Sequence, residues 1–266
     1  MPIVCDIDVE PIGEEEFHEI DERVMRFAFD IHNEIGRFFR EDIYNRELAR
    51  RCRVSGLQAE REVGIVVRHD DFVYRYSCDL VVEKSVPYEL KTTHQIIGDH
   101  EKQAINYLLL MGLHHGGVIN FRPASVQRRL VSTKLTHEKR CDYQICDGNL
   151  ACGDEPTANM RQILCDLFDD WGLFLGIELY RKALIHFLGG PDACVQEVDI
   201  CVDGDLLGQQ KMCLLDKQTA LHMSAIHQHT ESYAKHIRRI LKTTPLHRIQ
   251  WVNIHKHRAM FRTIHK

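Results

Sequence analysis

Residues 72–91 read FVYRYSCDLVVEKSVPYELK, and this stretch decides the fold. The apolar and aromatic runs at 72–82 and 86–91 have the composition of β-strands, and the EKS between them favours a turn. A further run, REVGIVVR at 61–68, precedes them and is joined to them by the turn-forming HDD. The sequence therefore predicts neighbouring antiparallel strands connected by short hairpin turns.

Helical patterns flank these strands on both sides. Apolar residues recur at helical spacing over residues 14–34, and a second helix is expected at 39–51, after Gly36. Beyond the strands, a helix at 100–112 is followed by strands at 116–121 and 126–131. Because a strand, a helix and a strand follow one another here, we expect a right-handed parallel crossover after the antiparallel strands.

The order of elements recurs in the second half of the chain. Residues 136–158 are polar and aperiodic, and we interpret them as a linker or long loop. After them we expect helices at 160–171, 172–188 and 228–242 and strands at 195–202, 206–215, 219–226, 247–254 and 258–264. Three segments of the two halves align at a nearly constant offset, which places Gly36 and Tyr44 on Gly172 and Tyr180, Cys78 on Cys213, and Asn120 on Asn253. This recurrence indicates an internal duplication.

Two carboxylates lie in the neighbouring strands of the first half. Asp79 ends an apolar run, and Glu89, Leu90 and Lys91 follow in the next strand, where alternation places Glu89 and Lys91 on one face. If these strands pair, Asp79 and Glu89 converge, and with the Leu90 carbonyl they would form an oxygen site for Mg²⁺ or Mn²⁺. Lys91 would then orient a water or neutralise developing charge. An exposed Glu89–Lys91 ion pair is the alternative.

The motifs around these residues resemble the GxxExxY protein family, a branch of the PD-(D/E)XK nuclease superfamily. The resemblance covers about residues 15–121 and rests on Gly36…Glu41-x-x-Tyr44, CDLVVE, YELK, KQxxNYL and GxxINF. Phe38 stands where the family has the glycine that opens its motif, and family members are usually about half as long as this chain.

This resemblance has implications for fold, site and reaction. It implies a restriction-endonuclease-like α/β fold, in which helices flank a mixed sheet of α-β-β-β-α-β order. It also implies Mg²⁺-dependent hydrolysis of phosphodiester bonds in nucleic acid, DNA or RNA. Carried over residue by residue, the family's site becomes Glu41, Asp79, Glu89, Lys91 and Gln103.

The resemblance and the duplication together predict a domain organisation. A nuclease-like domain would span 1–135, a linker 136–158, and a degenerate nuclease-like domain 159–266. The internal alignment places Asp79, Glu89 and Lys91 on three residues that bind Mg²⁺ poorly: Leu214, Ser224 and Ile226. We therefore expect the second half to keep the fold and lose the chemistry, with Leu214 and Ile226 plugging the former pocket. Four bases on its expected helix 228–242 are candidates for nucleic-acid contacts: Lys235, Arg238, Arg239 and Lys242.

Composition narrows the class of protein. The 266 residues are 44% hydrophobic and 27% charged, as in soluble globular proteins, and no apolar run reaches the roughly 20 residues that a membrane span needs. The N-terminal residues lack the pattern of a signal peptide, so we expect a cytoplasmic protein with reduced cysteines and no membrane partner. Cys141, Cys146 and Cys152 match no familiar zinc or cluster spacing.

Charge is distributed unevenly along the chain. The net charge of −5 gives no overall argument for nucleic-acid binding, but residues 1–22 contain nine acids and no Lys or Arg, whereas nine bases and no acids follow Glu231. This basic end either binds phosphates or complements the acidic N-terminus.

Two functions remain open from the sequence. The first is a Mg²⁺-dependent nuclease with its site in the N-terminal half, and the alternative is a non-catalytic nucleic-acid- or protein-binding module on the same scaffold. A homodimer is compatible with either. The intact set of carboxylates, lysine and glutamine favours the enzyme, because a site that is no longer used usually decays.

Overall fold

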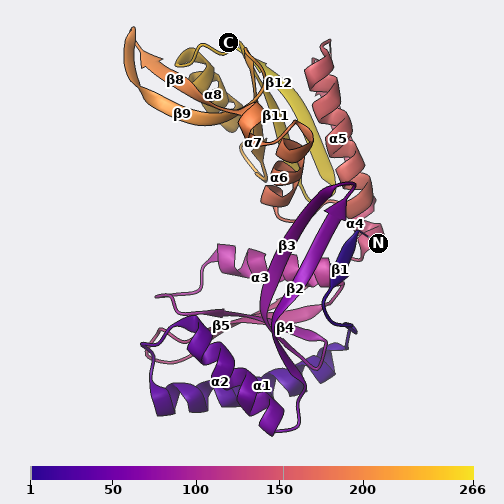
Figure 1. The fold of residues 1–266 in the computed structure, drawn as a ribbon, viewed down its shortest axis with the longest axis vertical. Helices are drawn as coiled ribbons and strands as arrows, with labels where there is room; N and C mark the ends of the chain where they lie inside the picture. Colours follow the sequence, from indigo (N-terminus) through magenta and orange to yellow (C-terminus); the bar gives the residue numbers. More distant parts are fainter. Residues whose placement is uncertain (1, 152) are drawn as a thin grey trace. The chain divides into compact units, whose positions relative to one another are not determined.

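The computed structural model describes residues 2–151 and 153–266. The chain divides into two compact units, Met1–His137 and Glu138–Lys266, and Figure 1 shows the sheet and helices of each. Each unit contains one six-stranded mixed sheet, which confirms the mixed α/β fold class predicted from the sequence. Cys152, one of the three cysteines singled out above, lies outside the described residues. No helix in the described ranges is long and apolar enough to cross a membrane.

Unit 1 contains the helices and strands predicted for the first half of the chain and one further strand, β1. Its elements are β1 (Ile3–Cys5), α1 (Glu14–Ile35), α2 (Glu41–Val54), β2 (Ala59–His69), β3 (Phe72–Val82), β4 (Val86–Lys91), α3 (Gly98–Met111), β5 (His115–Asn120) and β6 (Gln127–Ser132). The strands lie in the sheet in chain order, β1 to β6. β4 and β5 are parallel, while the other neighbouring pairs are antiparallel. The helix α3 therefore makes the predicted crossover between the two parallel strands.

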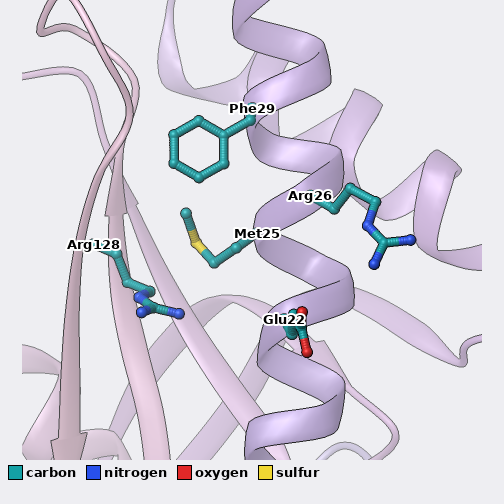
Figure 2. Close-up of a pocket in the computed structure, with 5 residues that line it drawn as sticks. All are labelled: Glu22, Met25, Arg26, Phe29 and Arg128. Carbon is teal, nitrogen blue, oxygen red and sulfur yellow. The ribbon is translucent and has the colours of Figure 1, made fainter.

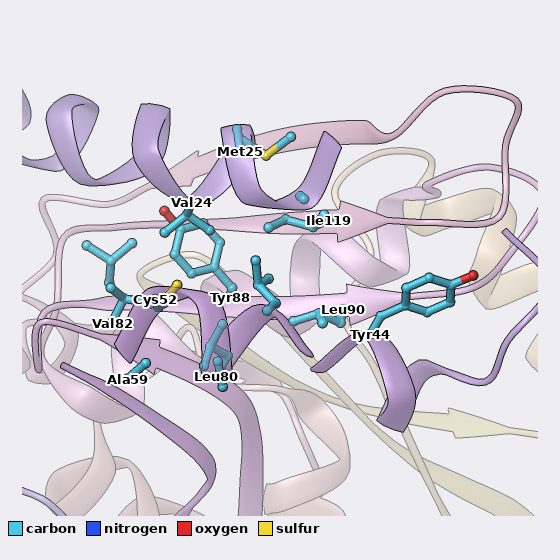
Figure 3. Close-up of a cluster of buried hydrophobic side chains, with 14 of the residues drawn as sticks. Val24, Met25, Tyr44, Cys52, Ala59, Leu80, Val82, Tyr88, Leu90 and Ile119 are labelled. Atoms are coloured by element: carbon cyan, nitrogen blue, oxygen red, sulfur yellow. The ribbon is translucent and has the colours of Figure 1, made fainter. Parts of the chain in front are cut away.

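The sheet of unit 1 has a helical layer on each face. α1 and α2 cover one face and α3 the other (Figure 1). Alternate residues of β4, including Tyr88 and Leu90, point into the buried cluster under α1 and α2, which Figure 3 shows together with Tyr44 and Ile119. Since successive side chains of a strand point to opposite faces, Glu89 and Lys91 lie on the face that α3 covers.

A buried charge ties α1 to the sheet. Asp21 is 1% exposed, accepts a hydrogen bond from the Tyr88 hydroxyl at 3.1 Å, and pairs with Arg128 of β6. Burial raises the pKa of Asp21, although Arg128 and Tyr88 both act to lower it. Beside this pair, Met25 and Phe29 of α1 line a mainly apolar pocket with Arg128 (Figure 2). The pairing with Arg128 and Tyr88 is what makes a carboxylate tolerable in this core.

The remaining elements follow His137. They are α4 (His137–Cys141), β7 (Gln144–Asn149), α5 (Glu155–Trp171), α6 (Ile177–Phe187), α7 (Pro191–Cys194), β8 (Val195–Val202), β9 (Asp205–Asp216), β10 (Thr219–Ser224), α8 (Thr230–Lys242), β11 (Arg248–His255) and β12 (Arg258–His265). In the sheet, the order is β7-β12-β11-β10-β9-β8. Ile249 and Trp251 of β11 pack in a cluster with α8, whereas Gln250 between them bonds to Thr157 of α5. This alternation puts α8 and α5 on opposite faces of the sheet.

The expected linker at 136–158 is wrong. This segment contains α4, β7 and the start of α5, and β7 pairs in parallel with β12. Arg140 of α4 is 2% exposed and donates to the Trp171 carbonyl at 2.6 Å. A strand at the edge of a sheet needs backbone partners but no run of apolar side chains, so the polar composition concealed it.

From α5 onward, unit 2 repeats the connectivity of unit 1. β8, β9 and β10 are antiparallel neighbours, β10 and β11 are parallel across α8, and β11 and β12 are antiparallel. These are the pairings of β2 to β6, and α8 takes the position between strands that α3 has in unit 1. The strand order expected for a second copy of the fold is therefore present.

Candidate active site

Asp79 and Glu89 meet on neighbouring antiparallel strands. Leu80 of β3 lies opposite Tyr88 of β4, so that Asp79 and Glu89, one residue beyond this pair on each strand, share the face that α3 covers. Asp79 Oδ2 accepts a hydrogen bond from the Leu90 N–H at 2.8 Å, which fixes the carboxylate against β4. The convergence of these two carboxylates is the one expected from the hairpin.

Burial dominates the electrostatics of this pair. Glu89 is 2% exposed, and burial together with the charge of Asp79 raises its pKa to about 7. Burial also raises the pKa of Asp79, against the effect of the hydrogen bond from Leu90. Among the described residues, Glu89 Oε2 is buried and has no hydrogen-bond partner. Two close carboxylates with one unsatisfied oxygen form a site that favours a cation or a proton.

Lys91 supplies the positive charge at this face. Its ammonium group pairs with Glu89 Oε1, and its side chain is 15% exposed. Burial acts to lower the pKa of Lys91, but the hydrogen bond and charge of Glu89 raise it above the ordinary value. The Glu89–Lys91 pair is therefore buried and held in place, which rules out the exposed ion pair left open by the sequence.

The helix α2 brings Glu41 toward the same residues. Glu41 is the first residue of α2, where burial raises its pKa, Lys91 lowers it and Asp79 raises it. One helical turn later, Asn45 is 4% exposed, and its side-chain amide donates to the Asp79 main-chain carbonyl at 2.8 Å. Asn45 thus anchors α2 on β3 at Asp79. Asn45 was not identified from the sequence, and its position one helical turn after Glu41 is the only signal that could have pointed to it.

Gln103 is connected to β3 through a tyrosine. Its side-chain amide donates to the Tyr107 hydroxyl at 3.0 Å, and that hydroxyl donates to the Ser77 carbonyl at 2.9 Å. Burial and the charge of Glu89 raise the pKa of Tyr107. The two residues, one turn apart on α3, therefore connect this helix to β3 two residues before Asp79, and the hydroxyl of Tyr107 lies within the electrostatic influence of Glu89.

The residues present fit a divalent cation in part. The orphaned Glu89 Oε2 and the neighbouring Asp79 supply hard oxygen donors of the kind that Mg²⁺ and Mn²⁺ prefer. Within the described ranges, no group of three or more His, Cys, Asp or Glu side chains is arranged as a metal site. Any further ligands would therefore be backbone carbonyls or waters, a coordination typical of Mg²⁺.

Strand register corrects the expected match between the two units. In unit 1, Lys91 lies opposite Asn120, and in unit 2, Ser224 lies opposite Asn253. Lys91 therefore corresponds to Ser224, not to Ile226. The same register places Glu89 on His222 and Asp79 on Met212, not on Ser224 and Leu214. The alignment of Cys78 with Cys213 caused this two-residue error, since the position of Cys213 is that of Leu80.

The apolar plug expected in unit 2 is misplaced: Leu214 and Ile226 do pack in an apolar cluster, but they do not stand at the positions of Asp79 and Lys91. His222 shares a 2.7 Å hydrogen bond with the Tyr233 hydroxyl. The Trp251 indole donates to Ser224 Oγ at 2.8 Å, and Ser224 in turn donates to Asn253 Oδ1 at 2.7 Å. Hydrogen-bonded polar residues thus stand at the positions of Glu89 and Lys91, and Met212 stands at that of Asp79. The expectation that unit 2 lacks the negative charge of the carboxylates still agrees with Met212, His222 and Ser224.

Two hydrogen-bonded motifs repeat at matching positions. The Tyr44 hydroxyl donates to the Gly36 carbonyl at 2.8 Å, and the Tyr180 hydroxyl donates to the Gly172 carbonyl at 2.5 Å. The side-chain amide of Asn120 accepts a hydrogen bond from the Thr93 N–H and donates one to the Thr93 carbonyl. The side-chain amide of Asn253 makes the same pair of bonds with the main chain of Ile226. Each motif uses the same residue type at the same place in the topology, which strengthens the correspondence of the units.

Comparisons with known proteins agree with this geometry. A family model described as PD-(D/E)XK nuclease superfamily matches residues 18–131. A comparison with curated proteins gives no match. The matched segment begins within α1, ends within β6, and includes every residue of the candidate site. Residues 18–131 of this chain therefore form a domain of the PD-(D/E)XK nuclease superfamily.

Proposed function

We propose that unit 1 is a divalent-metal-dependent nuclease that hydrolyses phosphodiester bonds of nucleic acid. The observation that carries this proposal is the buried Asp79–Glu89 pair, with one oxygen that has no partner among the described residues. A buried like-charge pair is costly without a compensating cation, so its presence beside Lys91 favours a working metal site over a solely structural one.

The position of each side chain in the site suggests its role in the reaction. Asp79, Glu89 and the Leu90 carbonyl would hold Mg²⁺ or Mn²⁺, with Glu41 taking part through water. When bound, the cation polarises a phosphate oxygen and acidifies a coordinated water. Lys91, already fixed by Glu89, orients the attacking water and offsets charge on the phosphate. Gln103 positions Tyr107 against β3 and so keeps α3 in register with the carboxylates.

Substitution of Asp79 tests this function. Asp79→Asn keeps an oxygen for the Leu90 N–H and removes the charge, so we expect loss of metal-dependent cleavage with an unchanged or higher melting temperature. Asp79→Ala also removes the acceptor, which costs about 1–3 kcal/mol if the Leu90 N–H is left unsatisfied. Cleavage of single- and double-stranded DNA and RNA is measured with Mg²⁺ and with Mn²⁺.

Metal calorimetry on the same proteins separates the enzyme from its rival. Wild type should bind Mn²⁺, and the Asp79→Asn, Glu89→Gln double variant should not. Equal binding by the two would place the metal elsewhere. If wild type binds nucleic acid but cleaves none of the four substrates with either metal, the non-catalytic binding module is the correct function.

We further propose that unit 2 descends from unit 1 by duplication and has lost its chemistry. The shared connectivity and the repeated Tyr–Gly and Asn–backbone bonds support this origin, and Met212, His222 and Ser224 support the loss of function. Membership of unit 1 in the GxxExxY family rests on the motifs around Glu41, Asp79 and Glu89. The cytoplasmic location and the homodimer expected from the sequence stay predictions.

A further inference from the structure

An aromatic ring with basic neighbours lies beside the candidate active site. Arg37, Phe38, His94, Arg122 and Pro123 line a pocket of about 310 Å³. These residues come from three loops: the one before α2, the one after β4 and the one after β5. Because β4 and β5 are parallel, their carboxyl ends lie at the same edge of the sheet, and the loops that follow them meet there.

The ring of Phe38 is open to solvent and has two guanidinium groups over it. Phe38 is 75% exposed, and the guanidinium carbons of Arg37 and Arg122 lie 5.2 and 6.0 Å from its ring centroid. Arg122 is directed by a 3.3 Å hydrogen bond from its Nε to the Thr92 carbonyl. An exposed ring with guanidinium groups over it is suited to an unstacked nucleobase and its flanking phosphates.

The pocket adjoins the residues of the proposed chemistry. Glu41 follows Phe38 by three residues, at the start of α2, and Thr92, which receives the bond from Arg122, directly follows Lys91. A nucleotide on Phe38 would therefore lie next to the phosphate that the carboxylates act on.

Unit 2 contains a pocket at the matching place. It is about 250 Å³ in volume, and its lining includes Phe174, His255 and Lys256. Phe174 follows Gly172 as Phe38 follows Gly36, and His255 follows Asn253 as Arg122 follows Asn120. His227, which corresponds to His94, stacks on His255 with ring centroids 4.6 Å apart. The aromatic ring is thus retained, with His255 and Lys256 beside it, where Asp79, Glu89 and Lys91 have no counterparts. Leu173 stands where unit 1 has Arg37, and the rest of this lining is apolar: Leu175, Ile177, Ala225 and Ile254.

We propose that each unit holds one nucleotide of a single-stranded nucleic acid in this pocket, and that unit 2 keeps the binding pocket without cleavage. The base stacks on Phe38 or Phe174, and the adjacent basic side chains contact the phosphates. This inference rests on the proposed function of unit 1 and names its substrate as an unpaired strand. Retention of the pocket without the carboxylates is what a separate binding role predicts.

The test measures binding without cleavage. The full chain with Asp79→Asn is titrated in EDTA against fluorescein-labelled 12-nucleotide single strands of DNA and of RNA and against a DNA duplex. Phe38→Ala and Phe174→Ala should each weaken single-strand binding about tenfold, while Phe38→Trp should restore it. Phe29→Ala, which removes a 42% exposed ring from the pocket of Figure 2, is the matched control and should have no effect.

Two further measurements guard against a folding artefact. Thermal melts check that each variant folds, and Lys256→Gln, an exposed substitution beside Phe174, should lower the slope of log K against log salt by about one. If Phe174→Ala and Lys256→Gln both bind like the parent, the role of unit 2 is overturned.

The remaining outcomes separate this inference from the proposed function. Parental affinity in Phe38→Ala, tighter binding of duplex than of single strands, or no binding of any probe overturns the pocket assignment. The proposed nuclease function is decided separately, by cleavage with wild type and by its loss in Asp79→Asn.

Discussion

Lys91 and Glu89 form a buried ion pair two residues apart on one strand, and their geometry follows from local sequence. The alternation of β4 places both side chains on the α3 face, and their pairing holds the ammonium group beside Asp79 and Glu41. Such a fixed charge needs no reorganisation as charge develops on a phosphate.

We therefore expect Lys91→Met to lower turnover at least 100-fold with little change in substrate affinity, because the group acts mainly in the transition state. Methionine keeps the aliphatic length of the side chain, and Glu89, with a pKa of about 7, can take up a proton when its partner is removed. Steady-state cleavage kinetics give kcat and KM separately. Lys102→Met removes an exposed lysine from α3 and should leave both constants unchanged. Wild-type turnover in Lys91→Met would exclude the role given to this residue.

Parts of the site were predictable from residues and parts were not. The meeting of Asp79 with Glu89 follows from hairpin pairing, which depends on neighbouring segments of sequence. The contacts of Asn45 and Tyr107 depend on how α2 and α3 dock on the sheet. Docking of helices is set by tertiary packing, so a single sequence offers no spacing rule that identifies these two anchors.

At the scale of elements, α1 and α2 are linked by a network of charges. Arg51 of α2 bonds to Glu34 of α1 and to Glu47 of its own helix. The hydrogen bond from Arg50, supported by that from Arg51, lowers the pKa of Glu47 to about 2. A carboxylate with a depressed pKa stabilises the fold above its unfolded pKa, and this contribution is lost as pH falls through the folded value.

The contribution of Glu47 should therefore disappear between about pH 4.5 and about pH 2. We expect wild type to be more stable than Glu47→Gln at pH 6, by less than about 1 kcal/mol since partly exposed pairs are screened. The difference should vanish below about pH 2. Urea unfolding of both proteins across this range measures it, and a difference independent of pH would contradict the assignment.

The repeated tyrosine bonds make a matched pair of predictions. Tyr44 and Tyr180 are fully buried, and each hydroxyl donates to the carbonyl of the glycine eight residues earlier. Tyr44→Phe and Tyr180→Phe should each cost about 1–3 kcal/mol of unfolding free energy, because the glycine carbonyl, buried at Gly172 and half-buried at Gly36, loses its donor. Tyr143→Phe removes an exposed bond to Asp169 and should cost less. Denaturant unfolding provides the comparison, and equal small losses in all three would show that these bonds do not hold the helices.

The helices and strands that the sequence did not predict are short, and several of them are polar. β1, α4, β7 and α7 were not predicted, and each has three to six residues. Longer elements had enough apolar repeats to be recognised, and β3 and β4 begin and end where expected. A short edge strand exists because a neighbouring strand offers backbone partners, which local composition does not record.

At the scale of the whole molecule, bases gather on α8. Lys235, Arg238, Arg239 and Lys242 are all exposed. Reversing Arg238, Arg239 and Lys242 to Glu should weaken nucleic-acid binding and flatten its salt dependence, by a slope of about one for each phosphate that the helix no longer neutralises. Lys211→Glu and Lys217→Glu reverse exposed bases of the same unit outside α8 and serve as the control. Unchanged affinity and salt slope in the α8 variant would leave this helix a structural role only.

The sequence by itself determined the fold class, the order of the longer strands and helices, and the convergence of Asp79, Glu89 and Lys91. These follow from periodicity and hairpin pairing, which are local properties. Only the tertiary structure decided which residues of the two units correspond. Backbone hydrogen bonds between β10 and β11 fix Ser224 opposite Asn253. A sequence alignment that matches Cys78 with Cys213 contains no information on this strand register. The paired aromatic pockets likewise emerged only when three loops, distant in sequence, met at the ends of parallel strands.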